Sequence, residues 1–184
     1  MKPANHDLSM ARAFLACLDR DGVFTFQTFD DNAQRKDQRL NAVRHGTFDE
    51  HVESLVSLNR NGAGVFVMVN RGDGKPHPGK NTCRCNENVI AVRALFADAD
   101  GVPVEPILKK APPPHILVES SQGKWHLYWL TNDTSLDEFS ARQSAIATAL
   151  GTDPAVKDRA RVMRLPGFYH QKGEPFMTRL VLPE

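Results

Sequence analysis

The segment 115–130 constrains the fold most strongly. Two apolar stretches, residues 115–118 and 125–130, flank the turn sequence Ser-Ser-Gln-Gly at 120–123. Stretches joined by so short a turn pair as an antiparallel hairpin. The sheet that contains them is therefore not purely parallel.

Helix and strand patterns alternate along the rest of the chain. Apolar residues at helical spacing predict a first helix from Asp7 or Ser9 to Asp21-Gly22. Thr47 with Glu50 and Ser135 with Glu138 are capping boxes that begin two further helices, which end near residues 61 and 151. Strands are predicted at 23–29, 65–69, 89–97, 162–165 and 177–182. Residues 30–46 are read as a polar loop or weak helix, and 71–88 and 103–114 as loops rich in Gly or Pro. This order predicts an α+β fold with a sheet covered on one face by helices.

Composition sets the class of protein. The chain has 184 residues, 41% hydrophobic and 24% charged, which suits one compact domain or two small lobes. A net charge of +1 does not by itself require a nucleic-acid partner. Three cysteines, an odd number, argue against a disulfide framework and favour a reducing compartment such as the cytoplasm. No apolar run is long enough for a membrane span, so no membrane association is expected.

Asp98 and Asp100 end the apolar strand at 89–97. Alternate side chains of a strand share a face, so the two carboxylates project together. At about 4 Å they repel by about 4 kcal/mol at an effective dielectric of 20. A divalent cation would relieve that repulsion, since Mg²⁺ binds through carboxylates and substrate phosphates. The alternative is a frayed strand end with both groups in water.

The hairpin turn offers donors for an anion. Small residues at 120–123 let backbone N–H groups approach a phosphate closely. Lys124 and His126 share one face of the outgoing strand and can both donate hydrogen bonds. An ordinary hairpin with an exposed Lys and a half-buried His explains the pattern equally well.

The third segment is basic. Arg159, Arg161 and Arg164 fall within six residues, shortly after Asp153. Arginine suits phosphate better than lysine does. Arg161 and Arg164 stand among apolar residues, and buried arginines need anionic partners. A solvated charged loop is the alternative.

In this order the three segments resemble the motifs of the archaeo-eukaryotic primase superfamily, in a form similar to primases of plasmids, phages and integrated elements. The resemblance covers residues 62–175. It implies two αβ modules with a mixed or antiparallel sheet, one like an RNA-recognition motif (RRM-like), and an active site in the cleft between them. The chain would be one catalytic domain, 1–184, with an N-terminal αβ part at about 1–85 and the RRM-like part, with the metal site, at about 86–184.

The resemblance also implies residue roles. Catalysis and binding of two Mg²⁺ or Mn²⁺ ions would fall to Asp98, Asp100 and Asp153. Nucleotide binding would fall to Ser121, Lys124, His126, Arg161, Arg164 and Lys172. Asp158 is a second candidate for the third carboxylate, but the spacing from Asp153 to Arg164 fits the family's pattern better.

The implied function is template-directed DNA priming or polymerisation, which releases pyrophosphate from nucleoside triphosphates, in replication of a plasmid, phage or integrated element. Its partners would be a single-stranded DNA template and the triphosphates. Related primases often need a helical accessory domain, and helicases are common fusion partners, so we expect either to come from outside these 184 residues. Primer extension is therefore a safer expectation than de novo initiation.

Three alternatives concern the same residues or the loop before them. A non-catalytic RRM-like nucleic-acid-binding module would stack bases on Phe66, Tyr128 and Trp129. A metal-dependent nuclease could use the same three carboxylates. A zinc site at His77, Cys83 and Cys85 is disfavoured, because C-x-C is not C-x-x-C and a structural zinc takes four ligands.

Overall fold

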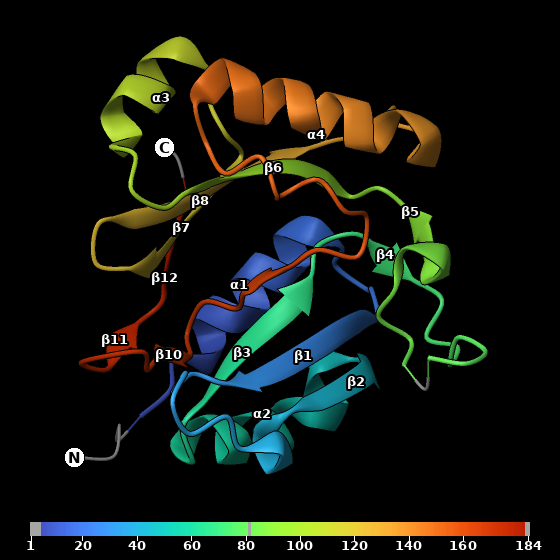
Figure 1. Ribbon diagram of the computed structural model, residues 1–184, viewed down its shortest axis with the longest axis vertical. Helices are drawn as coiled ribbons and strands as arrows, with labels where there is room; N and C mark the ends of the chain where they lie inside the picture. Colours follow the sequence, from blue (N-terminus) through green and yellow to red (C-terminus); the bar gives the residue numbers. More distant parts are fainter. Residues whose placement is uncertain (1–4, 81, 183–184) are drawn as a thin grey trace.

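Two four-stranded antiparallel sheets form the centre of the molecule. The computed structural model describes residues 5–80 and 82–182. One sheet has the order β2-β1-β3-β9 and the other β12-β7-β8-β6. In Figure 1 they lie one below the other, with α2 beneath the lower sheet and α3 and α4 above the upper one. The predicted α+β class is confirmed; the order of elements alone suggested a single sheet, whereas the structure has these two.

The lower sheet contains a strand that the sequence did not reveal. Its strands are β1 (Phe24–Asp30), β2 (Ala42–Gly46), β3 (Ala63–Met68) and β9 (Val162–Arg164). Residues 42–46 were expected to be loop or weak helix, yet they pair with β1 as an edge strand, with Phe26 opposite Arg44. An edge strand is less buried than a central one, and none of these five residues is fully buried, so no apolar alternation marks it.

The upper sheet is built around the predicted hairpin. Its strands are β6 (Ala94–Ala99), β7 (Ile116–Ser121), β8 (Lys124–Leu130) and β12 (Arg179–Val181). Strand β7 runs through Ser121, so the turn is shorter than predicted, and Gly123 supplies its positive φ of +71°.

Two predicted strands are divided. Residues 89–97 form β5 (Val89–Ala91), which pairs with β4 (Arg71–Gly72), and then β6. The buried Arg93 marks the break and donates a hydrogen bond to Asp19. The C-terminal strand is likewise split into β11 (Phe176–Met177), which pairs with β10 (Tyr169–His170), and β12.

The helices follow the predicted caps with one exception. Both capping boxes are present, at α2 (Phe48–Arg60) and α4 (Leu136–Leu150), and α1 spans Leu8–Leu18. The Pro-rich connection contains a further helix, α3 (Val104–Lys110). Its prolines lie before the helix and in the first turn, where no intrahelical N–H bond is needed, so they do not break it. No described helix is long and apolar enough to cross a membrane.

One core holds the two sheets together. Phe14 of α1 packs edge-on against Tyr128 of β8, and Phe96 of β6 packs against Phe139 of α4. These side chains belong to one buried cluster with Phe26 of β1. This shared core fixes the two sheets relative to each other.

Candidate active site

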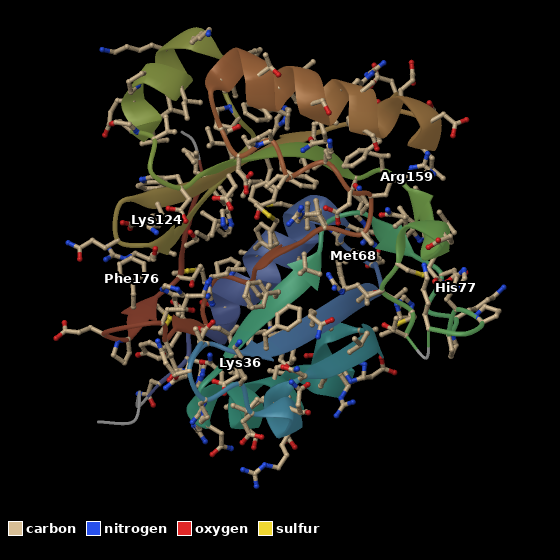
Figure 2. All side chains as sticks on the ribbon, viewed as in Figure 1. Lys36, Met68, His77, Lys124, Arg159 and Phe176 are labelled. Carbon is tan, nitrogen blue, oxygen red and sulfur yellow. The ribbon has the colours of Figure 1, made fainter. Side chains whose placement is uncertain are left out.

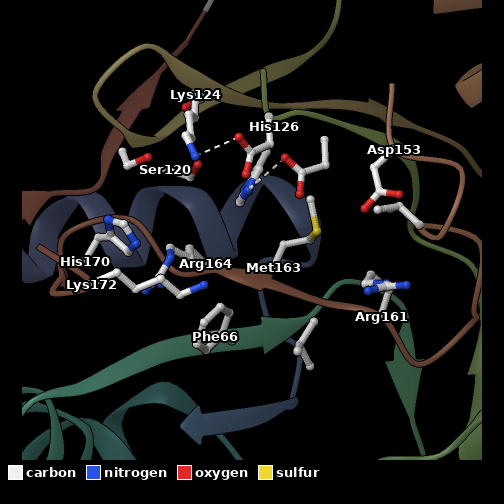
Figure 3. Close-up of a pocket in the computed structure, with 15 residues that line it drawn as sticks. Phe66, Ser120, Lys124, His126, Asp153, Arg161, Met163, Arg164, His170 and Lys172 are labelled. Carbon is white, nitrogen blue, oxygen red and sulfur yellow. Dashed lines mark hydrogen bonds and ion pairs between the residues drawn. The ribbon is translucent and has the colours of Figure 1, made fainter. Parts of the chain in front are cut away.

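A pocket lies between the two sheets and collects residues from distant parts of the sequence (Figure 3). Strands β6 and β8 supply one wall, and β3, β9 and the segment after β9 supply the other. All nine residues that the sequence analysis selected line it: Asp98, Asp100, Ser121, Lys124, His126, Asp153, Arg161, Arg164 and Lys172. Their shared location is a property of the fold.

The acidic wall is electrostatically strained. Asp98 stands in β6 opposite His126 of β8, and Asp100 follows at the strand end. Burial, and then the charges of Asp100 and Asp153, raise the pKa of Asp98 to about 6. Lys124 Nζ lies 2.7 Å from Asp100 Oδ1 and offsets part of the negative charge.

A buried glutamine places Asp153 beside this wall. Gln143 of α4 accepts a hydrogen bond from Phe96 N and donates to Phe96 O and to Val156 O, each at 2.9 Å. It therefore pairs with backbone groups on the outer edge of β6 and links the loop after α4 to that strand. Asp153 N in turn donates to Asp98 O at 3.4 Å. A mid-helix Gln gives no sequence signal for this, because only the fold brings β6 to it.

The three aspartates share the pocket without converging on one point. Within the described residues, only His77, Cys85 and Glu87 place three ligand-type atoms within 4.8 Å of one another. The Asp98, Asp100 and Asp153 carboxylates therefore lie further apart than that, and Asp100 is paired with Lys124. Asp158, the other candidate, pairs with Arg161 at 2.6 Å and is not among the lining residues described.

His126 is a neutral donor. Its side chain is buried, and that burial, followed by the charge of Arg164, lowers its pKa to about 3. The Tyr128 hydroxyl lies 3.4 Å from Nδ1, while Nε2 faces Asp98 Oδ1 at 3.8 Å. A proton donated by Tyr128 to Nδ1 leaves the ring N–H on Nε2, directed at the pocket. Burial raises the pKa of Tyr128, so its hydroxyl stays protonated.

Arg164 is held by a residue that the sequence analysis missed. Its Nη1 and Nη2 donate to the two carboxylate oxygens of Asp31 at 3.1 and 2.8 Å. The guanidinium also lies 4.6 Å from the ring centroid of Phe66. The sequence predicted that a buried arginine needs an anion, but 133 residues separate the pair, so nothing local identified Asp31.

The remaining basic groups face the same space. Arg161 pairs with Asp158, whereas Lys172 is exposed and makes no salt bridge within the described part of the chain. His170, which the sequence analysis did not select, also lines the pocket. Burial and the charge of Arg164 lower its pKa to about 4.

The base-stacking platform of the binding-module reading does not form. Tyr128 is fully buried in the core. Trp129 lies on the opposite face of β8, against α3 and α4. Phe66 alone of the three lines the pocket.

Part of the chain matches a known protein family. Residues 93–183 match the family model of the RepB DNA-primase N-terminal domain. No curated protein sequence is significantly similar to the chain.

Solved structures match over nearly the whole chain. The AEP domain of the primase-polymerase of cyanophage S-2L superposes with a TM-score of 0.74 at 17% identity, over 97% of this chain and 91% of that one. Primase RepB' gives a TM-score of 0.66 at 17% identity, over 96% of this chain and 56% of that one. The catalytic domain of RepB' in complex with initiator DNA gives 0.61 at 16% identity, over 92% and 81%.

The site motifs, the family match and the shared fold agree. The chain therefore has the fold of primase catalytic domains from plasmids and phages, and its residues 93–183 match the RepB DNA-primase N-terminal domain.

Proposed function

We propose that this chain is the catalytic core of a DNA primase-polymerase. It transfers nucleotides from nucleoside triphosphates to a 3′ end on a single-stranded DNA template and releases pyrophosphate, in replication of a plasmid, phage or integrated element. One observation carries the proposal: a single pocket sets three carboxylates against arginine and lysine side chains from the opposite wall. A nucleic-acid-binding surface gains nothing from acids beside its phosphate contacts.

The carboxylates suit hard divalent cations. Asp98, Asp100 and Asp153 offer only oxygen donors, the ligands of Mg²⁺ and Mn²⁺. Burial, and then the charges of Asp100 and Asp153, raise the pKa of Asp98, so a bound cation would stabilise its carboxylate form. Two bound ions would supply the charge neutralisation that an in-line displacement at phosphorus needs.

The protein's own side chains bind and orient the triphosphate. Lys172 is exposed and free of a salt bridge among the described residues, and Arg164 is fixed by Asp31, so both present positive charge to phosphate oxygens. Arg161 lies below Asp153 in Figure 3 and adds a third cation. Neutral His126 donates through Nε2–H, and Ser121 and Lys124 place the hairpin end beside it. Holding the reactants in line is the main contribution expected of the protein.

Primer extension is the activity that we assign to this segment. A helical accessory domain or a helicase remains the proposed partner for initiation. The related RepB' catalytic domain was solved with initiator DNA, which supports a DNA template here.

A primed-template assay tests the proposal. End-labelled primer on a longer template is incubated with nucleoside triphosphates and Mg²⁺ or Mn²⁺. The wild type should lengthen the primer, and Asp98→Asn should lower the rate at least about 100-fold while remaining folded. The matched control is Asp133→Asn, whose carboxylate is 79% exposed and outside the pocket.

The outcomes separate the alternatives. Full extension by folded Asp98→Asn would refute the assignment. Metal-dependent shortening of the labelled primer in the absence of nucleoside triphosphates would indicate a nuclease instead. Tight template binding with no metal-dependent product would indicate a binding module.

A further inference from the structure

A second group of metal-ligating side chains lies outside the pocket, in the loop at residues 73–88 between β4 and β5 (Figure 2). His77, Cys85 and Glu87 each offer one ligand atom, and these atoms lie within 4.8 Å of one another. The C-x-C spacing disfavoured zinc in the sequence. The structure brings Glu87, and not Cys83, to His77 and Cys85, which no spacing rule suggested.

The donors differ in kind from those of the pocket. Thiolate, imidazole and carboxylate are zinc ligands, whereas Mg²⁺ and Mn²⁺ prefer oxygen alone. Cys85 is buried, His77 half-buried and Glu87 exposed, so the group has one side in the protein and one toward solvent. Three protein ligands leave the fourth position of a tetrahedral ion for water.

A lysine beside the group does not block it. Lys80 Nζ lies 3.0 and 3.2 Å from the two Glu87 carboxylate oxygens. Both side chains are about half exposed, at 47% and 53%. Exposed pairs of this kind contribute little to stability, so a divalent ion can displace the ammonium.

The loop at residues 73–88 is long and has little regular secondary structure. Connections of this length without extended secondary structure are uncommon in compact domains. Asn88 ties the base of the loop through hydrogen bonds to Asp73 and to Lys75 O. Asn86 Oδ1 accepts a hydrogen bond from Ala160 N at 3.0 Å, which joins the loop to the segment that carries Arg161.

We propose that His77, Cys85 and Glu87, with water in the fourth position, bind a zinc ion that cross-links this loop. The ion orders the loop and is separate from the divalent ions of the pocket. Its loss should loosen the loop and lower the midpoint of thermal unfolding, and the loop should become a site of proteolytic cleavage.

Metal content and cobalt spectra test this independently of polymerase activity. The wild type should retain one zinc ion per chain after dialysis. Replacement by Co²⁺ should give a thiolate-to-metal charge-transfer band, which an all-carboxylate site cannot produce. The band should persist in Asp98→Asn, so failure of the proposed catalytic site and failure of this site are distinguishable.

The variants make the result specific. Cys85→Ser should abolish the band, and His77→Ala should release the zinc while circular dichroism shows a folded chain. Cys17→Ser is the matched control, because Cys17 lies in α1, remote in sequence from the loop. This variant should retain both the band and the zinc. Absence of the band in the wild type, or its persistence in Cys85→Ser, would overturn the proposal.

Discussion

Replacing Asp31 by Asn should destabilise the protein strongly, because it leaves Arg164 buried without a counter-charge. The two side chains are only 2% and 8% exposed. The Asp31 carboxylate accepts both guanidinium hydrogen bonds and a third, at 2.8 Å, from Gln171 N. Asparagine keeps the shape but removes the charge and half of the acceptor capacity.

The magnitude follows from this burial. Removing one partner of a buried ion pair costs about 3–5 kcal/mol. For a chain of this size each kcal/mol lowers Tm by roughly 2–4 °C, so we expect a fall of roughly 6–20 °C. The same change frees the Arg164 guanidinium to move, so binding of a nucleoside triphosphate should weaken even at temperatures where the variant is folded.

Urea unfolding followed by circular dichroism measures the first effect, and triphosphate titration at low temperature measures the second. Asp133→Asn is the control: it removes an ion pair with Arg142 in which the side chains are 79% and 40% exposed, and it should leave Tm nearly unchanged. If Asp31→Asn unfolds at the same urea concentration as that control, the buried pair does not stabilise the fold as argued.

Three further predictions concern the pocket. Because the pKa of Asp98 is raised to about 6 from 3.8, its contribution to stability is full below pH 3.8 and lost as pH rises through 6. Without metal, the Tm of Asp98→Asn should therefore be higher than that of the wild type at about pH 7.5 and equal to it at about pH 4. Equal Tm values at both pH values would contradict the raised pKa. Mn²⁺ affinity of the wild type, measured by calorimetry, should fall about tenfold per pH unit below pH 6, since a proton competes for Asp98; a flat profile would argue against Asp98 as a ligand. In Gly64→Ala the new Cβ would lie 2.5 Å from Asp31 Oδ1 and 2.7 Å from Arg164 Nη1, so we expect about 1–3 kcal/mol of destabilisation and weaker triphosphate binding, whereas Gly173→Ala, with open space around it, should match the wild type.

The helices that carry caps and the central hairpin were predictable from sequence. The capping boxes at Thr47 and Ser135 satisfy helix N-termini with residues three positions apart, so a local pattern suffices. Strand β2 and helix α3 were not, because an edge strand needs no alternation and the prolines beside α3 look like breakers.

The same division holds for the candidate site. Asp98, His126 and Arg164 carry local signals, namely alternation at a strand end, a small-residue turn and a buried basic cluster. Their partners do not: Gln143 reaches β6 across 47 residues, and Asp31 reaches Arg164 across 133. Sequence determined which groups could do the chemistry. Tertiary structure decided which groups hold them in place, because a buried polar atom takes its partner from whatever segment the fold brings to it.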